Sequence, residues 1–246
     1  MDPFSFPPFA AVLSGASALI TSMAEAIGDV LPIGVAVLVA IAVATLAVRA
    51  ALLPVGLSSA RAQVARSRLA PRLRDLQKRH AKDAVTLGRK TQELYAAEGV
   101  SPFAGMLPAL VQIPVVSVVY GVFTRATIAG HANALLAHTV FGTPLGASFA
   151  GLLAAGSVAQ LALPLVFLLV IAAAAVTSRH FTLRTSRRLD PSAPAPGTMA
   201  RALSWLPVLS VVFAALAPVA ASVYLAVTMW WTAVERTLAT RDPRHV

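Results

Sequence analysis

The sequence predicts an all-α membrane protein that crosses the bilayer several times. The chain of 246 residues is 57% hydrophobic and only 12% charged, with a mean hydropathy of +0.76, whereas an average soluble domain is about one quarter charged. Its apolar runs are long enough to cross a bilayer core, which takes about 20 residues. Basic residues gather between these runs, with 20 Lys+Arg against 10 Asp+Glu. We expect five transmembrane helices, a cytoplasmic amphipathic helical hairpin and an external N-terminal interfacial helix.

The first two elements are the interfacial helix and the first span. Residues 9–27 are moderately apolar but contain Glu25 and several small polar residues, which favours an external interfacial helix within segment 1–30 over another span. Residues 31–53 are apolar apart from Arg49 and form the first span. A cation inside a bilayer is costly and by default suggests function. Arg49 near a helix end could also snorkel to the headgroups, and the residues alone leave both interpretations open.

A basic segment follows the first span. Residues 54–101 contain ten Lys+Arg and four acids, so they form a soluble loop. Apolar residues recur in it at helical spacing, at Leu69, Leu73 and Leu76 and again at Leu87, Leu94 and Tyr95. This periodicity predicts two short amphipathic helices that turn near residues 81–83. Pro71 fits the first turn of the first helix, where its missing N–H costs little.

The middle of the chain supplies two further spans. Residues 102–124 are uncharged and form the second span. The next uncharged run, 126–178, has 53 residues, which is too long for one span. Its first part is rich in loop-forming residues, so we expect an external loop at 125–157 and a third span at 158–178. A second basic loop follows at residues 179–201.

The last uncharged run, residues 202–234, predicts two spans. As one helix its 33 residues would reach about 50 Å, so two short spans at 202–217 and 218–234 fit better, turning near Pro218. The short tail at 235–246 then joins the two basic loops, and 18 of the 20 Lys+Arg lie on one side. The positive-inside rule makes that side cytoplasmic. The N-terminus is expected outside and the C-terminus in the cytoplasm.

Catalytic motifs are absent from the sequence. It contains no phosphate-binding or dinucleotide-binding glycine pattern, no HExxH, no GxSxG and no cysteine. We therefore expect no enzyme activity and no cofactor. His131 and His138 could stack as metal ligands, but a site needs three or four ligands, so no metal site is predicted. DNA binding is not expected, because the basic residues lie between apolar runs rather than on a soluble surface.

Three uncharged side chains could extend a polar surface from Arg49. Thr45 lies one turn away and could widen a polar stripe, or could bond to its own backbone. Gln112, in the second span, could face the same interior or contact a neighbouring helix. Tyr224, in the last span, is typical of interfacial aromatic residues. The residues alone do not choose between these alternatives.

One block of the sequence resembles the YidC/Oxa/Alb family of membrane protein insertases. The block extends from Thr45 to Tyr120, and its motifs, in family order and spacing, are TLAVRAALLP at 45–54, LAP at 69–71, ELY at 93–95, GVSP at 99–102 and LPALVQIP at 107–114. The pair of spans from Leu206 to Tyr224 is similar to the family's closing hairpin. The resemblance covers about residues 28–236.

The resemblance implies a non-enzymatic insertase of the bacterial plasma membrane, in the short form without a large external domain. Its helices would enclose a polar groove, open to the cytoplasm and to lipid and closed outside. Arg49 would line the groove and attract acidic residues of the substrate, with Thr45, Gln112 and Tyr224 as further groove residues. Expected partners are nascent membrane proteins and the lipid bilayer, with the ribosome, targeting factors and the Sec translocon as candidates. The apolar stretch Ala172–Val176 departs from the family, because a polar residue is usual there.

Two other classes of protein stay open. A small polytopic transporter or channel subunit would use the same polar stripe for a solute, so that replacing Arg49 would abolish a flux. A structural assembly factor would tolerate the loss of Arg49 altogether.

Overall fold

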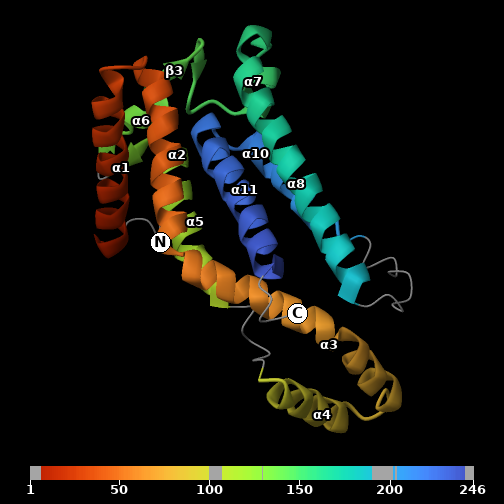
Figure 1. The fold of residues 1–246 in the computed structure, drawn as a ribbon. Coiled ribbons are helices and arrows are strands. Elements are labelled where there is room, and N and C mark those ends of the chain that lie inside the picture. Colours follow the sequence, from red (N-terminus) through yellow and green to blue (C-terminus); the bar gives the residue numbers. More distant parts are fainter. Residues whose placement is uncertain (1–6, 100–106, 129, 190–201, 203, 242–246) are drawn as a thin grey trace.

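The computed structural model describes residues 7–99, 107–128, 130–189, 202 and 204–241. Helices dominate this part of the chain, and Figure 1 shows their arrangement. The helices are α1 (Pro7–Gly28), α2 (Ile33–Ala51), α3 (Leu53–Arg79), α4 (Ala84–Ala97), α5 (Leu107–Thr124), α6 (Ala134–Ala137), α7 (Phe149–Ala154), α8 (Ala162–Leu189), α10 (Leu206–Leu216) and α11 (Val219–Arg241), with a 3₁₀ helix at Val158–Gln160. The described chain also contains two antiparallel strand pairs, β1 (Thr127–Ile128) with β2 (His131–Ala132) and β3 (Thr139–Val140) with β4 (Thr143–Pro144).

The long helices form a bundle with two different ends. We call the end that carries α3 and α4 the hairpin end, and the end that carries the segment from β1 to α7 the loop end (Figure 1). Helix α11 packs against α2, α3, α5, α8 and α10, and its buried residues belong to both buried apolar clusters of the bundle. The core of the bundle therefore lies around α11.

Three described helices are long and apolar enough to cross a membrane by length and composition. They comprise Pro8–Gly28, Ile33–Ala51 and Ala162–Thr185, and two shorter apolar helices lie at Val115–Thr124 and Leu206–Leu216. Large apolar side chains on their outer faces are exposed, such as Leu169 and Phe213. Apolar surface of this extent suits contact with lipid rather than water.

Helix α1 differs from the expected interfacial helix. It lies antiparallel alongside α2 and runs from the hairpin end to the loop end (Figure 1), whereas the sequence places the N-terminal segment outside, at the loop end. The cause is a stripe of buried residues, Leu13, Ile20 and Ala24, that joins the same core as α2. Its spacing of seven and four residues brings the stripe to one helix face.

The amphipathic hairpin is built from one long helix and one short helix. Helix α3 follows α2 with only Leu52 between them, and it has 27 residues. Pro71 lies inside α3 rather than in its first turn, so that prediction is wrong. The chain turns at residues 80–83, as the periodicity predicts. Asp83 caps α4 by accepting the Thr86 N–H at 3.0 Å, and hydrogen bonds from Thr86 lower the pKa of the Asp83 carboxyl.

An ion pair joins the two arms of this hairpin. Arg72 of α3 pairs with Glu98, the residue that follows α4. Both side chains are exposed, and exposed ion pairs contribute little to stability. The arms are therefore weakly tied, since α4 has no buried residue.

The loop end is covered by the segment between α5 and α8. Asn133 holds the end of α5, because its amide donates to the carbonyls of Val122 at 2.6 Å and Arg125 at 3.0 Å. The backbone N–H groups of Val219 and Ala220 donate to carbonyls of the same segment, at 2.9 and 3.1 Å. These bonds tie the cover to both α5 and α11, so the loop end of the bundle is closed by ordered backbone.

The closest approach in this cover involves Gly34. A Cβ at this position would lie 2.0 Å from the backbone oxygen of Thr139, so only glycine allows α2 to contact β3. We expect Gly34→Ala to lower the free energy of unfolding by about 1–3 kcal/mol, the usual cost of overpacking. The measurement is the thermal unfolding midpoint in detergent. Gly15→Ala is the control, because nothing lies within 4 Å of its Cβ. Equal midpoints for the two variants would contradict this packing.

Candidate functional site

Arg49 lies in the last turn of α2, at the hairpin end of the bundle. Its side chain is half-buried, and it has no hydrogen bond or ion pair with any residue in the described part of the chain. Residues four apart share a helix face, so Arg49 continues the face of Ile41 and Thr45, both of which are buried in the bundle. The face of α2 that enters the core therefore ends in a cation without a partner among these residues.

Thr45 does not extend this polar surface. Its hydroxyl donates to the carbonyl of Ile41 at 2.7 Å, and the side chain is buried. Of the two interpretations of Thr45, the structure shows the bond to its own helix. Thr45 is therefore a buried packing residue one turn from Arg49, and the single donor of its hydroxyl is already used.

Tyr224 lies apart from Arg49, whereas the structure does not describe the side chain of Gln112, in α5. Tyr224 lies near the start of α11, toward the loop end, whereas Arg49 lies at the hairpin end. Tyr224 is only 5% exposed, so it is a buried residue of the bundle rather than an interfacial aromatic. Arg49 and Tyr224 therefore do not belong to one cluster.

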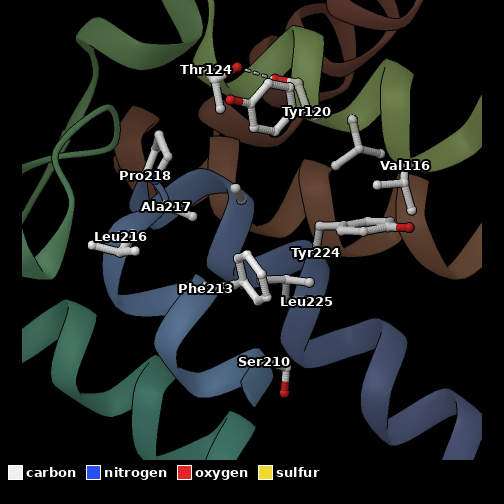
Figure 2. A pocket seen from close by; sticks show the side chains of 12 residues that line it. Val116, Tyr120, Thr124, Ser210, Phe213, Leu216, Ala217, Pro218, Tyr224 and Leu225 are labelled. Atoms are coloured by element: carbon white, nitrogen blue, oxygen red, sulfur yellow. Dashed lines mark hydrogen bonds between the residues drawn. The ribbon is translucent and has the colours of Figure 1, made fainter. Parts of the chain in front are cut away.

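Tyr224 instead lines a pocket between α5 and the α10–α11 pair. The pocket has a volume of about 490 Å³, and Figure 2 shows Tyr224 extending toward Val116 across it. Its lining residues are Val116, Val119, Tyr120, Thr124, Ser210, Phe213, Leu216, Ala217, Pro218, Ala221, Tyr224 and Leu225. The hydroxyls of Thr124 and Ser210 donate to carbonyls of their own helices, each at 2.5 Å. The pocket is therefore apolar in its chemistry.

A buried carboxylate lies at the hairpin end of α11. Glu235 is 7% exposed and accepts a hydrogen bond from Trp231 Nε1 at 2.7 Å. Its carboxylate presses against Gly56 of α3, where a Cβ would lie 2.2 Å from Oε1. Sequence reasoning placed residue 235 in a cytoplasmic tail and missed this contact. A signal was present, because a tryptophan precedes the acid by four residues and so shares its helix face.

The next residue, Arg236, turns to the other side of α11. Its Nη1 donates to the hydroxyl of Ser178 on α8 at 2.6 Å. Glu235 therefore fixes α11 to α3, and Arg236 fixes α11 to α8. Among the described residues, no group of three or more His, Cys, Asp or Glu could hold a metal ion.

These features define a class of protein: a polytopic helical membrane protein with a basic hairpin at one end, a covered opposite end and an arginine where a span meets the hairpin. The family model described as "60Kd inner membrane protein" matches residues 31–245. The chain belongs to this family, which is the YidC/Oxa/Alb family that the motifs indicate.

Curated relatives agree with this assignment. The chain is 36% identical over 98 residues to "Membrane protein insertase YidC" of Alkalilimnicola ehrlichii, which covers 40% of this chain and 17% of the relative. It is 31% identical over 99 residues to the protein of the same name from Clostridium perfringens, and this match covers 40% of this chain and 42% of the relative. It is also 38% identical over 90 residues to the protein of the same name from Oceanobacillus iheyensis, and this match covers 35% of this chain and 36% of the relative. The matches thus span less than half of each relative.

The contact between Gly56 and Glu235 can be tested by a double-mutant cycle. Gly56→Ala should displace the carboxylate and break its bond to Trp231, which lowers the unfolding midpoint in detergent. Glu235→Asp shortens the side chain, so the double variant should lose less than the sum of the single losses, by about 0.5–3 kcal/mol. Gly88→Ala is the control, since its Cβ would meet nothing within 4 Å. Strict additivity would contradict the contact.

Proposed function

We propose that this protein is a membrane protein insertase, which helps hydrophobic segments of nascent proteins enter the lipid bilayer. The observation that carries the proposal is Arg49, a half-buried cation at the end of a spanning-length helix with no ion pair among the described residues. Membership of the family and relatives named as insertases support it. No bond has to be made or broken in this function, so a site without a catalytic constellation is sufficient.

The proposed topology has a core of five spans, α2, α5, α8, α10 and α11, with the hairpin end in the cytoplasm. The positive-inside rule supports this orientation, because ten Lys+Arg lie in residues 54–101. The covered loop end then faces outside. Helix α1 packs along α2, beside this core, and is also long and apolar enough to cross the membrane. In this orientation the hairpin is the first part that a nascent chain, a targeting factor or the ribosome would meet.

Arg49 would act by electrostatic attraction. Two opposite unit charges 4 Å apart attract by about 1 kcal/mol in bulk water and about 4 kcal/mol near a protein surface with an effective dielectric constant of 20. An acidic residue of the substrate would therefore be held at the hairpin end more strongly than in water. Because Arg49 is otherwise unpaired among the described residues, binding the acid would not require breaking an internal ion pair.

The apolar pocket beside Tyr224 would receive the hydrophobic part of the substrate. Its walls come from α5, α10 and α11, and the exposed side chains of Phe213 and Leu216 border it. Burying one large apolar side chain contributes about 1.5–3 kcal/mol. The pocket would lower the cost of the first apolar residues leaving water, and transfer of the remaining segment into lipid would drive insertion.

The role of Arg49 is tested by depletion of the protein and complementation. We expect Arg49→Ala to reduce insertion of a small membrane protein with an acidic tail by at least tenfold, because the attraction is lost. Arg49→Lys should retain most of the activity if charge rather than guanidinium geometry matters. The readout is protease protection of single-span and double-span test proteins.

Arg187→Ala is the matched control, because Arg187 is an exposed arginine of α8, outside the hairpin and the pocket. Normal insertion in the null strain and in both Arg49 variants would contradict the proposal. Loss of a solute flux with normal insertion would instead identify a transporter or channel subunit.

The pocket is tested by site-specific crosslinking during insertion. A photoreactive residue at Phe213 or Tyr224 should crosslink to a stalled nascent membrane segment. The same group at Leu165, an exposed apolar residue of α8 outside the pocket, should crosslink mainly to lipid. Equal substrate crosslinking at all three positions would argue against this route.

A further inference from the structure

Besides Arg49, a pair of arginines lies at the hairpin end, where α8, α10 and α11 meet. Arg179 of α8 donates through Nε to the hydroxyl of Ser204 at 3.4 Å, and its Cζ lies 4.2 Å from the centroid of the Trp205 ring. Arg236 of α11 donates to the hydroxyl of Ser178, the residue next to Arg179. The two guanidinium groups therefore flank the same turn of α8.

Neither arginine forms a salt bridge with a carboxylate in the described part of the chain, and Glu235 acts on Arg236 only through longer-range attraction. The acid adjacent in sequence to Arg236 is Glu235, and its carboxylate is turned toward Gly56 and Trp231 on the other side of α11. A guanidinium has five N–H donors, and each of these two makes a single hydrogen bond to a serine there. Both side chains are half-buried, so donors of two cations are left for an external anion.

Apolar surface continues from this pair toward the middle of the bundle. Trp205 is 51% exposed, Leu209 is 51% and Val212 is 55%. Leu209 and Val212 lie on α10, and Trp205, the residue before α10, precedes Leu209 by four residues. On α8, Val176 lies one turn before Arg179 and is also exposed. A ligand that fits both the arginine pair and this apolar surface has an anionic head at the arginines and an apolar tail along α8 and α10.

We propose that Arg179, Arg236 and Trp205 form a binding site for the headgroup phosphate of an anionic phospholipid. Basic pockets between spanning helices are suited to such headgroups, and an arginine–phosphate hydrogen bond is charge-assisted and short. Tryptophan is favoured at the level of the headgroups. A free phosphate ion offers the same anionic chemistry, but it would leave the exposed surface of Trp205 and Leu209 uncovered.

The first test is native mass spectrometry of the full chain in detergent, with phosphatidylglycerol or phosphatidylcholine of matched acyl chains. We expect the wild type to retain one phosphatidylglycerol at least tenfold more tightly than phosphatidylcholine. Arg179→Ala with Arg236→Ala should abolish this preference. Arg184→Ala with Arg187→Ala is the matched control, because it removes two exposed arginines further along α8. The control should keep the preference.

Three results would overturn the proposal. One is an equal loss of preference in both double variants, which would indicate diffuse attraction to positive charge. Another is equal retention of the two lipids by the wild type. The third is displacement of the bound lipid by millimolar glycerol 3-phosphate, which would assign the site to a soluble phosphate compound.

A second measurement works without arginine variants and so does not depend on their folding. Lipids brominated near the headgroup quench the fluorescence of nearby tryptophan, and Trp205→Phe identifies the contribution of Trp205 by difference. We expect brominated phosphatidylglycerol to quench that contribution at least twofold more than brominated phosphatidylcholine at equal mole fraction. Equal quenching by the two lipids would overturn the proposal.

Discussion

The packing of α11 against the other long helices is the constraint on which the rest of the structure depends. Small residues at its loop end make this possible, since Ala220, Ala221 and Ser222 are buried and allow close approach. Helix interfaces inside membranes favour such residues because apolar side chains gain little by leaving lipid. The same helix belongs to both buried clusters of the bundle, one with α1, α2 and α5 and one with α8 and α10. Displacing α11 would therefore open both the pocket beside Tyr224 and the joint with α3.

The hairpin end of α11 holds two charged residues, Glu235 and Arg236, at the edge of an apolar bundle. Burying an unpaired charge costs several kcal/mol, and Glu235 lowers that cost through its hydrogen bond from Trp231. Arg236 donates a hydrogen bond to the hydroxyl of Ser178 on the opposite side of α11. Because the two charges point away from each other, α11 is fixed to α3 and α8 at once. This joint sets where the basic hairpin leaves the bundle.

Hydropathy predicts most helices of this fold, because lipid leaves a spanning chain few other structures. The helices α2 and α10 lie within the predicted apolar runs, and the turn falls at Pro218. Helices α8 and α11 continue beyond their runs, to Leu189 and Arg241, into residues that were predicted as a loop and a tail. Hydropathy does not predict tertiary contacts. Glu25 and the small polar residues of α1 obscured the stripe that packs on α2, and no pattern indicated that Leu52 alone would separate α2 from α3. Arg49 was recognisable as a charge in an apolar run. For Glu235 the only local signal was Trp231, four residues earlier, because its burial depends on Gly56, far away in sequence.

The positions of Arg49 and Tyr224 at different levels of the bundle restrict how the proposed insertase could work. A single polar groove along the whole bundle would need polar walls at both levels, but the hydroxyls beside Tyr224 are bonded to their own helices and Thr45 is bonded to Ile41. A charge moved to the level of Tyr224 would lose its hydration without gaining a partner from these hydroxyls. The acidic end of a substrate would therefore stop at Arg49, and only its apolar part would advance. Under the proposed function, the division between a charged level and an apolar level would orient the substrate before lipid receives it.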